Sequence, residues 1–207
     1  PGDVRNMRSK TWPRRPLSWA SVLALILVVG VVAPTAAELR IDITQGTVEP
    51  LPIAVTNFLG TTPDETRFGQ DISGVISADL ERSGLFRSID HQAFIQTAKS
   101  LNTLPRFGSW RVINAQALIQ GQAQVVEDGR LRVQFRLWDV FAEQQMEGLA
   151  YTAEKAGWRR VAHLIADAVY KRITGEDGYF DTRIVYIAER GPPDRRIKRL
   201  AIMDQDG

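Results

Sequence analysis

The stretch "AQALIQGQAQVVEDGRLRVQFRLWD", residues 115–139, predicts the sheet on which the chain folds. Apolar and polar side chains alternate along both arms, as they do in half-buried strands. Ile119, Ala123 and Val125 share one face of the first arm, and glutamines occupy the other face. The inward residues expected on the return arm are Leu131, Val133, Phe135 and Leu137. Asp128-Gly129 between the arms is a strong hairpin signal, so the two arms are expected to pair antiparallel.

Further strands are expected on both sides of this hairpin. "ELRIDIT" (38–44) alternates strictly and predicts a half-buried strand. "PIAVTNF" (52–58) is more continuously apolar and predicts a more buried strand. A short strand is expected at "LFRSI" (85–89), and another at 145–152.

A capping box predicts the start of the first long helix. Thr62 can cap the helix, Pro63 suits its first position, and Glu65 completes the box. Apolar residues then recur at helical spacing up to Leu80, and Gly84 is expected to end the helix in a left-handed conformation.

A second long amphipathic helix is predicted from Trp158 to Ile173, with Gly175 as its C-terminal cap. A weaker helix over 91–100 and a short helical turn over 109–115 are also expected. Each long helix has one apolar face, which can be buried against one face of the sheet. The predicted fold class is therefore α+β: a mixed β-sheet with helices packed on one face.

The predicted domain spans 38–175, and "EDGYFD" (176–181) is expected to be a linker. A hairpin of strands at 182–188 and 197–203 should follow, joined by a Gly-Pro-Pro-Asp turn. A two-stranded hairpin alone is marginally stable in water. The hairpin is therefore expected to join further structure.

The N-terminal residues have the three parts of a secretory signal. A basic start follows Met7, an apolar run covers 22–33, and small residues precede a cleavage site expected between Ala37 and Glu38. Residues 1–6 are interpreted as upstream sequence. The alternative, a membrane anchor, would require about 20 apolar residues, more than this run provides. An Arg-Arg pair in the basic start is weak evidence for twin-arginine export over the general route.

Removal of the signal changes the charge of the chain. Five of the 26 basic residues and one of the 24 acidic residues precede Glu38, which leaves 21 and 23 and a net charge of −2. This balance disfavours binding to nucleic acid. The chain has no cysteine, so it can form neither a disulfide nor a thiolate zinc site.

The sequence offers little chemistry for catalysis. It contains neither a His-x-x-x-His pair, nor a G-x-S-x-G turn, nor a glycine-rich phosphate loop. His163 is interpreted as structural, and His91 as a capping or surface residue. "DQDG" (204–207) resembles part of a calcium loop but lacks the remaining ligands. We therefore expect no catalytic residues, no metal and no cofactor.

Four stretches resemble the TolB family of the Tol-Pal system in their order and spacing. They are "LPIAVTNF", "DISGVISADLERSGLFRSID", "WRVINAQALIQGQAQVVEDGRLRVQFRLWDVF" and "RRVAHLIADAVYKRITGEDGYFDTRIVYI". The resemblance implies an N-terminal α/β domain followed by a six-bladed β-propeller. Residues 182–207 would then be the first hairpin of a propeller that is otherwise missing.

The resemblance also implies partners. The lipoprotein Pal and bacteriocins would bind mainly to the propeller, so no Pal-binding residue is assigned. TolA would bind the first residues of the mature chain, which match "ELRIDITQGTVE" (38–49). The residues assigned to this contact are Glu38, Leu39, Arg40, Ile41, Asp42, Ile43 and Thr44. A segment with unpaired backbone groups can add to a partner sheet. The alternative is that this segment completes the sheet of its own domain.

The resemblance therefore implies a non-enzymatic adaptor in the periplasm of a Gram-negative bacterium. It would link inner-membrane TolA to outer-membrane Pal for envelope integrity and constriction at division, and bacteriocins would exploit it for import. No stable membrane insertion is expected once the signal is removed. Two alternatives stay open: a nucleic-acid-binding module with an anticodon-binding-like fold, and an exported hydrolase.

Overall fold

A computed structural model of the chain describes residues 49–96 and 100–206. The signal segment, the cleavage site at Ala37 and Glu38, and the strand predicted over 38–44 lie outside these residues. Among the described residues, no helix is long and apolar enough to cross a membrane.

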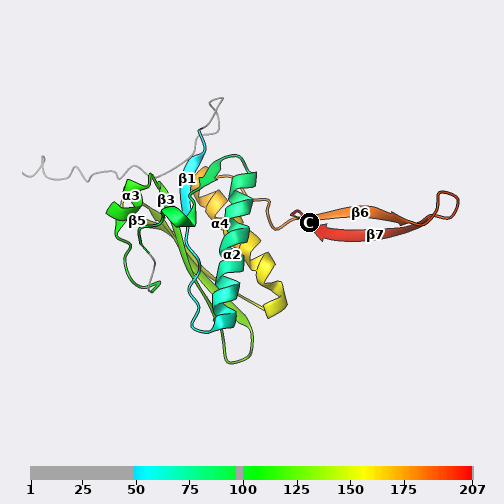
Figure 1. The fold of residues 1–207 in the computed structure, drawn as a ribbon, viewed down its shortest axis with the longest axis horizontal. Helices are drawn as coiled ribbons and strands as arrows, with labels where there is room; N and C mark the ends of the chain where they lie inside the picture. The colour runs from blue at the N-terminus through cyan, green and yellow to red at the C-terminus, as the bar shows by residue number, and fades with distance from the viewer. Residues whose placement is uncertain (1–48, 97–99, 207) are drawn as a thin grey trace, which may run out of the picture. The chain divides into compact units, whose positions relative to one another are not determined.

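A five-stranded sheet forms the centre of the α+β domain, with strand order β2-β1-β3-β4-β5 (Figure 1). Its strands are β1 (Leu51–Val55), β2 (Phe86–Ser88), β3 (Ala117–Val125), β4 (Leu131–Asp139) and β5 (Gln144–Ala153). β1 pairs in parallel with β2 and β3, whereas β3, β4 and β5 pair antiparallel. The sheet is therefore mixed, and the predicted hairpin at 115–139 is confirmed.

The two long helices, α2 (Pro63–Arg82) and α4 (Trp158–Thr174), pack on the same face of this sheet. Their apolar stripes meet the inward row of β1, β3 and β4 in one buried core. The capping box is confirmed: the Thr62 hydroxyl accepts from the Glu65 N–H, and the Glu65 carboxylate accepts from the Thr62 N–H. The predicted glycine caps are confirmed, with φ of 75° at Gly84 and 83° at Gly175.

The opposite face of the sheet carries a smaller core at one end. Short helix α3 (Phe107–Val112) supplies Phe107 and Trp110, which pack with Leu118 and Trp138 of the sheet. The helical turn predicted over 109–115 is therefore present, shifted towards the N-terminus. Gln120, predicted on the polar face, is also buried.

The helix predicted over 91–100 is wrong in the part that the structure describes. Only η1 (His91–Ala93) forms, as a single 3-10 turn. Asp90 caps this turn through the Gln92 N–H, and Phe94 already has extended backbone. The Phe94 ring packs edge-on against Trp110, with centroids 5.1 Å apart. This packing favours an extended chain over a weak helix, because tertiary contacts override a modest local propensity.

A second, short 3-10 turn, η2 (Lys155–Gly157), precedes α4. After α4, the stretch predicted as a linker is held against the domain. Phe180 is fully buried, and its N–H donates to Asp167 of α4 at 2.7 Å. The predicted terminal hairpin is confirmed as β6 (Arg183–Arg190) and β7 (Ile197–Asp204), which form a separate two-stranded sheet.

Candidate functional site

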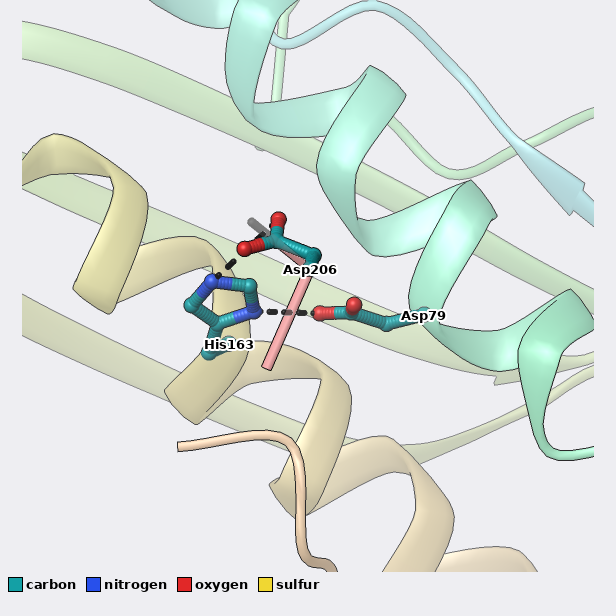
Figure 2. Close-up of side chains that lie close together, drawn as sticks. All are labelled: Asp79, His163 and Asp206. Atoms are coloured by element: carbon teal, nitrogen blue, oxygen red, sulfur yellow. Dashed lines mark hydrogen bonds and ion pairs between the residues drawn. The ribbon is translucent and has the colours of Figure 1, made fainter. Parts of the chain in front are cut away.

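A histidine lies between two aspartates in the buried part of the chain (Figure 2). Asp79 comes from the last turns of α2, His163 from the first half of α4, and Asp206 from the residues after β7. The side chains are 0%, 2% and 6% exposed, respectively. Charged side chains are seldom buried to this extent unless they are paired.

Each ring nitrogen of His163 faces a different carboxylate. Nδ1 lies 2.6 Å from Oδ2 of Asp79, which is hydrogen-bonding distance. Nε2 lies 3.7 Å from Oδ2 of Asp206, and no hydrogen-bond partner for Nε2 occurs among the described residues. Figure 2 shows the two contacts at different nitrogens of the ring. The imidazole therefore bridges α2 and the end of the hairpin.

Two partly exposed arginines pair with the two aspartates. Arg159 of α4 forms an ion pair with Asp206 through its guanidinium group. Arg82 of α2 donates to the other carboxylate, with Nη1 2.8 Å from Oδ1 of Asp79. The two arginine side chains are 38% and 41% exposed, so the charges of the cluster extend from the core to solvent.

The surroundings shift two pKa values in opposite directions. The hydrogen bond to Asp79 raises the pKa of His163 above its ordinary 6.5, although burial and the charge of Arg159 act against it. Burial tends to raise the pKa of Asp206, but its bond to Arg159 and the charge of His163 outweigh this and lower it. Both shifts favour the charged forms, a histidinium beside a carboxylate.

The same three residues form a group that could in principle hold a cation, because one ligand atom from each lies within 4.8 Å of the others. A chelated ion needs ligands that converge on one point. Here each carboxylate faces a different nitrogen of the ring, and Nδ1 is already taken up by its 2.6 Å contact with Asp79. The arrangement suits a protonated ring, whose positive charge lies beside both carboxylates.

A groove of about 410 Å³ reaches the cluster from the surface. Gly74 and Ala78 of α2 line the groove together with Trp158, Arg159 and Asp206. Water and protons can therefore reach the carboxylate of Asp206 through the groove. The site has access to the pH of its surroundings despite its burial.

The residues predicted as the TolA contact, 38–44, lie outside the described residues. The structural role expected for His163 agrees with its burial, and His91 is exposed and stacks on Phe94. The sequence did not indicate that His163, Asp79 and Asp206 come together, because Asp79 and His163 are 84 positions apart. The one local signal was the Asp-rich "DQDG", interpreted as a partial calcium loop.

The fold and the site define an α+β domain that holds a following β-hairpin by a buried ionic cluster. The family model described as the TolB amino-terminal domain matches residues 39–146. The chain belongs to this family.

A relative named Tol-Pal system protein TolB, from Paramagnetospirillum magneticum, is 57% identical over 188 residues. The match covers 91% of this chain and 42% of the relative. The crystal structure of TolB from Acinetobacter baumannii has the same fold, with a TM-score of 0.61 at 23% identity. That match covers 82% of this chain and 40% of the other. The chain thus spans about two fifths of the length of these proteins.

Proposed function

We propose that the chain is the N-terminal part of a non-enzymatic periplasmic adaptor of the Tol-Pal system. The adaptor would link TolA to Pal, support outer-membrane integrity and constriction at division, and be exploited for bacteriocin import. The observation that carries this proposal is the family match over 39–146 together with 57% identity to a Tol-Pal system protein. Export of the chain would leave a mature protein that begins at or near Glu38.

The proposed TolA contact is the segment from Glu38 to Thr44. Leu39, Ile41 and Ile43 form one apolar row, and the alternate residues are polar. Backbone pairing with a partner sheet would supply affinity, and the apolar row would set the register. A segment near a mature N-terminus can leave its own domain without opening a loop.

The terminal hairpin supports a continuation of the chain into a larger β-structure. Its large apolar side chains are widely exposed: Ile184, Val185, Tyr186, Ile187, Ile197, Leu200, Ile202 and Met203. Exposed apolar surface of this extent usually marks a contact surface. In the proposed adaptor these residues would face neighbouring propeller strands, and Pal would bind that part of the protein.

Capture of TolA tests the proposal directly. The mature chain from Glu38 and a shorter chain from Pro50 would be compared for binding to immobilised TolA. Ile41→Pro removes a backbone donor and should weaken capture at least severalfold, whereas Ile41→Val keeps both the strand and the apolar row and should bind normally. Equal binding by the chain from Pro50 would exclude the segment as the site.

A further inference from the structure

We propose that His163 is a proton-controlled clasp that joins the α+β domain to the segment after β7. In its charged form the imidazolium bridges Asp79 of α2 and Asp206, and loss of its proton weakens the hold on Asp206. The clasp requires no partner protein, so this inference does not depend on the proposed adaptor function.

The hydrogen-bonding requirements of the two ring nitrogens favour the charged form of His163. A neutral imidazole carries a proton on only one nitrogen, and the other nitrogen is an acceptor. The 2.6 Å contact with Oδ2 of Asp79, a hydrogen-bond acceptor, places that proton on Nδ1. Nε2 would then direct a lone pair at Oδ2 of Asp206, 3.7 Å away. Only the imidazolium turns this second contact into an attraction.

The charged groups around the ring come from three elements. Asp79 from α2 and Asp206 from the end of the hairpin are negative and favour the proton on His163. Arg159, on the same helix as His163, disfavours it, but it is itself paired with Asp206. Arg82 is paired with Asp79 on the side away from the ring nitrogen. The charged groups that face the two ring nitrogens are therefore both carboxylates. The two arginines pair with these carboxylates and not with the ring.

The pH range of the clasp follows from the two shifted groups. The pKa of His163 is raised, so its contribution is complete below its ordinary 6.5 and is lost as pH rises through the raised pKa. The pKa of Asp206 is lowered, so its contribution is complete above its ordinary 3.8 and is lost as pH falls through the lowered pKa. The hold on Asp206 should be strongest between these two ordinary values and should weaken as pH rises through the raised pKa of His163.

Histidine NMR on the full chain tests the coupling. The chain has two histidines, so the ring signals of His163 and of exposed His91 can be followed separately. Asp206→Asn should lower the titration midpoint of His163 and leave that of His91 unchanged. Asp206 follows β7 and belongs to neither apolar core of the domain, so the domain should stay folded. An unchanged His163 midpoint would overturn the proposal.

Amide hydrogen exchange tests the consequence for the segment. The protection of Gln205 and Asp206, corrected for intrinsic exchange, should fall severalfold between pH 6 and pH 8.5 in the wild type. In His163→Gln the ring charge is absent, so protection should be lower at pH 6 and nearly independent of pH. Protection that falls equally in both proteins would contradict the clasp. If His163→Gln fails to fold, the Asp206→Asn titration decides the matter alone.

Discussion

The carboxylate of Glu65 accepts a hydrogen bond from the backbone N–H of Val125, 60 positions later in the chain, at 2.7 Å. The bond uses Oε1, while Oε2 accepts from the N–H groups of Thr61 and Thr62 at 2.9 and 3.0 Å. One buried side chain thus caps α2 and fixes the end of β3 beside it. The N-terminal end of the helix is tied to the sheet through this residue.

Glu65→Ala should destabilise the domain by about 1–3 kcal/mol, because three backbone donors lose the acceptor of their partly buried hydrogen bonds. Glu65→Gln should be milder, since its amide oxygen can still accept part of the set. The neighbouring exposed Asp64→Ala is the matched control and should change stability by less than about 1 kcal/mol. Urea unfolding measures the stability of all three variants. Equal unfolding midpoints for Glu65→Ala and Asp64→Ala would contradict the stabilising role of the Glu65 carboxylate.

The same carboxylate should make the stability of the domain depend on pH. The bond from Val125 lowers the pKa of Glu65 below its ordinary 4.5, against the opposing effect of burial. Its contribution is therefore complete above 4.5 and is lost as pH falls through the lowered pKa. Between pH 5 and pH 3, wild type should lose more free energy of unfolding than Glu65→Gln. Parallel losses in the two proteins would place the acid sensitivity elsewhere.

Phe180 should act as an anchor for the stretch between α4 and the hairpin. Its ring is fully buried and lies edge-on to Tyr170, with centroids 5.7 Å apart. Phe180→Ala should cost about 3–5 kcal/mol, the range for truncating a buried aromatic side chain. Asp177→Asn, in the same stretch but highly exposed, should be nearly neutral because its pair with Lys171 lies at the surface. Thermal unfolding of the two variants would separate an anchored stretch from a free linker.

The terminal hairpin should be the first part of the described chain to be cleaved by trypsin. Arg190 and the basic residues of its turn region are exposed, and only two strands support them. Arg132 is also exposed but lies in β4 of the five-stranded sheet, and Arg130 lies in the tight turn that joins β3 to β4. Early fragments should therefore end within 190–199, as mass spectrometry would show. Equal rates at Arg130 and Arg190 would contradict this order.

Local signals in the sequence predicted much of the fold. The contacts that make the capping box join residues three positions apart, so Thr62 and Glu65 could be identified together. The Asp-Gly turn fixed the register of β3 and β4 in the same way. Periodic apolar residues were enough to place α2 and α4 on one face of the sheet.

Contacts between distant residues could not be predicted in this way. The second oxygen of Glu65 meets Val125 only because α2 lies along β3, and nothing near either residue indicates the bond. Asp79 and His163 meet because α2 packs on α4. The helix expected over 91–100 failed for the related reason that Phe94 packs against Trp110, which lies beyond the helical window.

Two glycines of α2 occupy opposite environments. A Cβ at Gly69 would lie 2.1 Å from the carbonyl oxygen of Phe58, which is backbone and cannot turn aside. A Cβ at Gly74 would meet nothing within 4 Å. Gly69 therefore permits close approach of the helix to the chain after β1, while Gly74 has no such role. Both have ordinary helical φ, so they differ in packing and not in backbone strain.

Alanine at these two positions should have effects of opposite sign. Gly74→Ala should stabilise the domain by about 0.5–1 kcal/mol, because alanine loses less backbone entropy than glycine in a helix. Gly69→Ala gains the same entropic stabilisation, but the added methyl group forces α2 away from Phe58. Overpacking of this kind costs about 1–3 kcal/mol. The net change at Gly69 should be destabilising. Urea unfolding of both variants measures the difference, and a stabilising Gly69→Ala would show that α2 can shift without disturbing the core around Phe58.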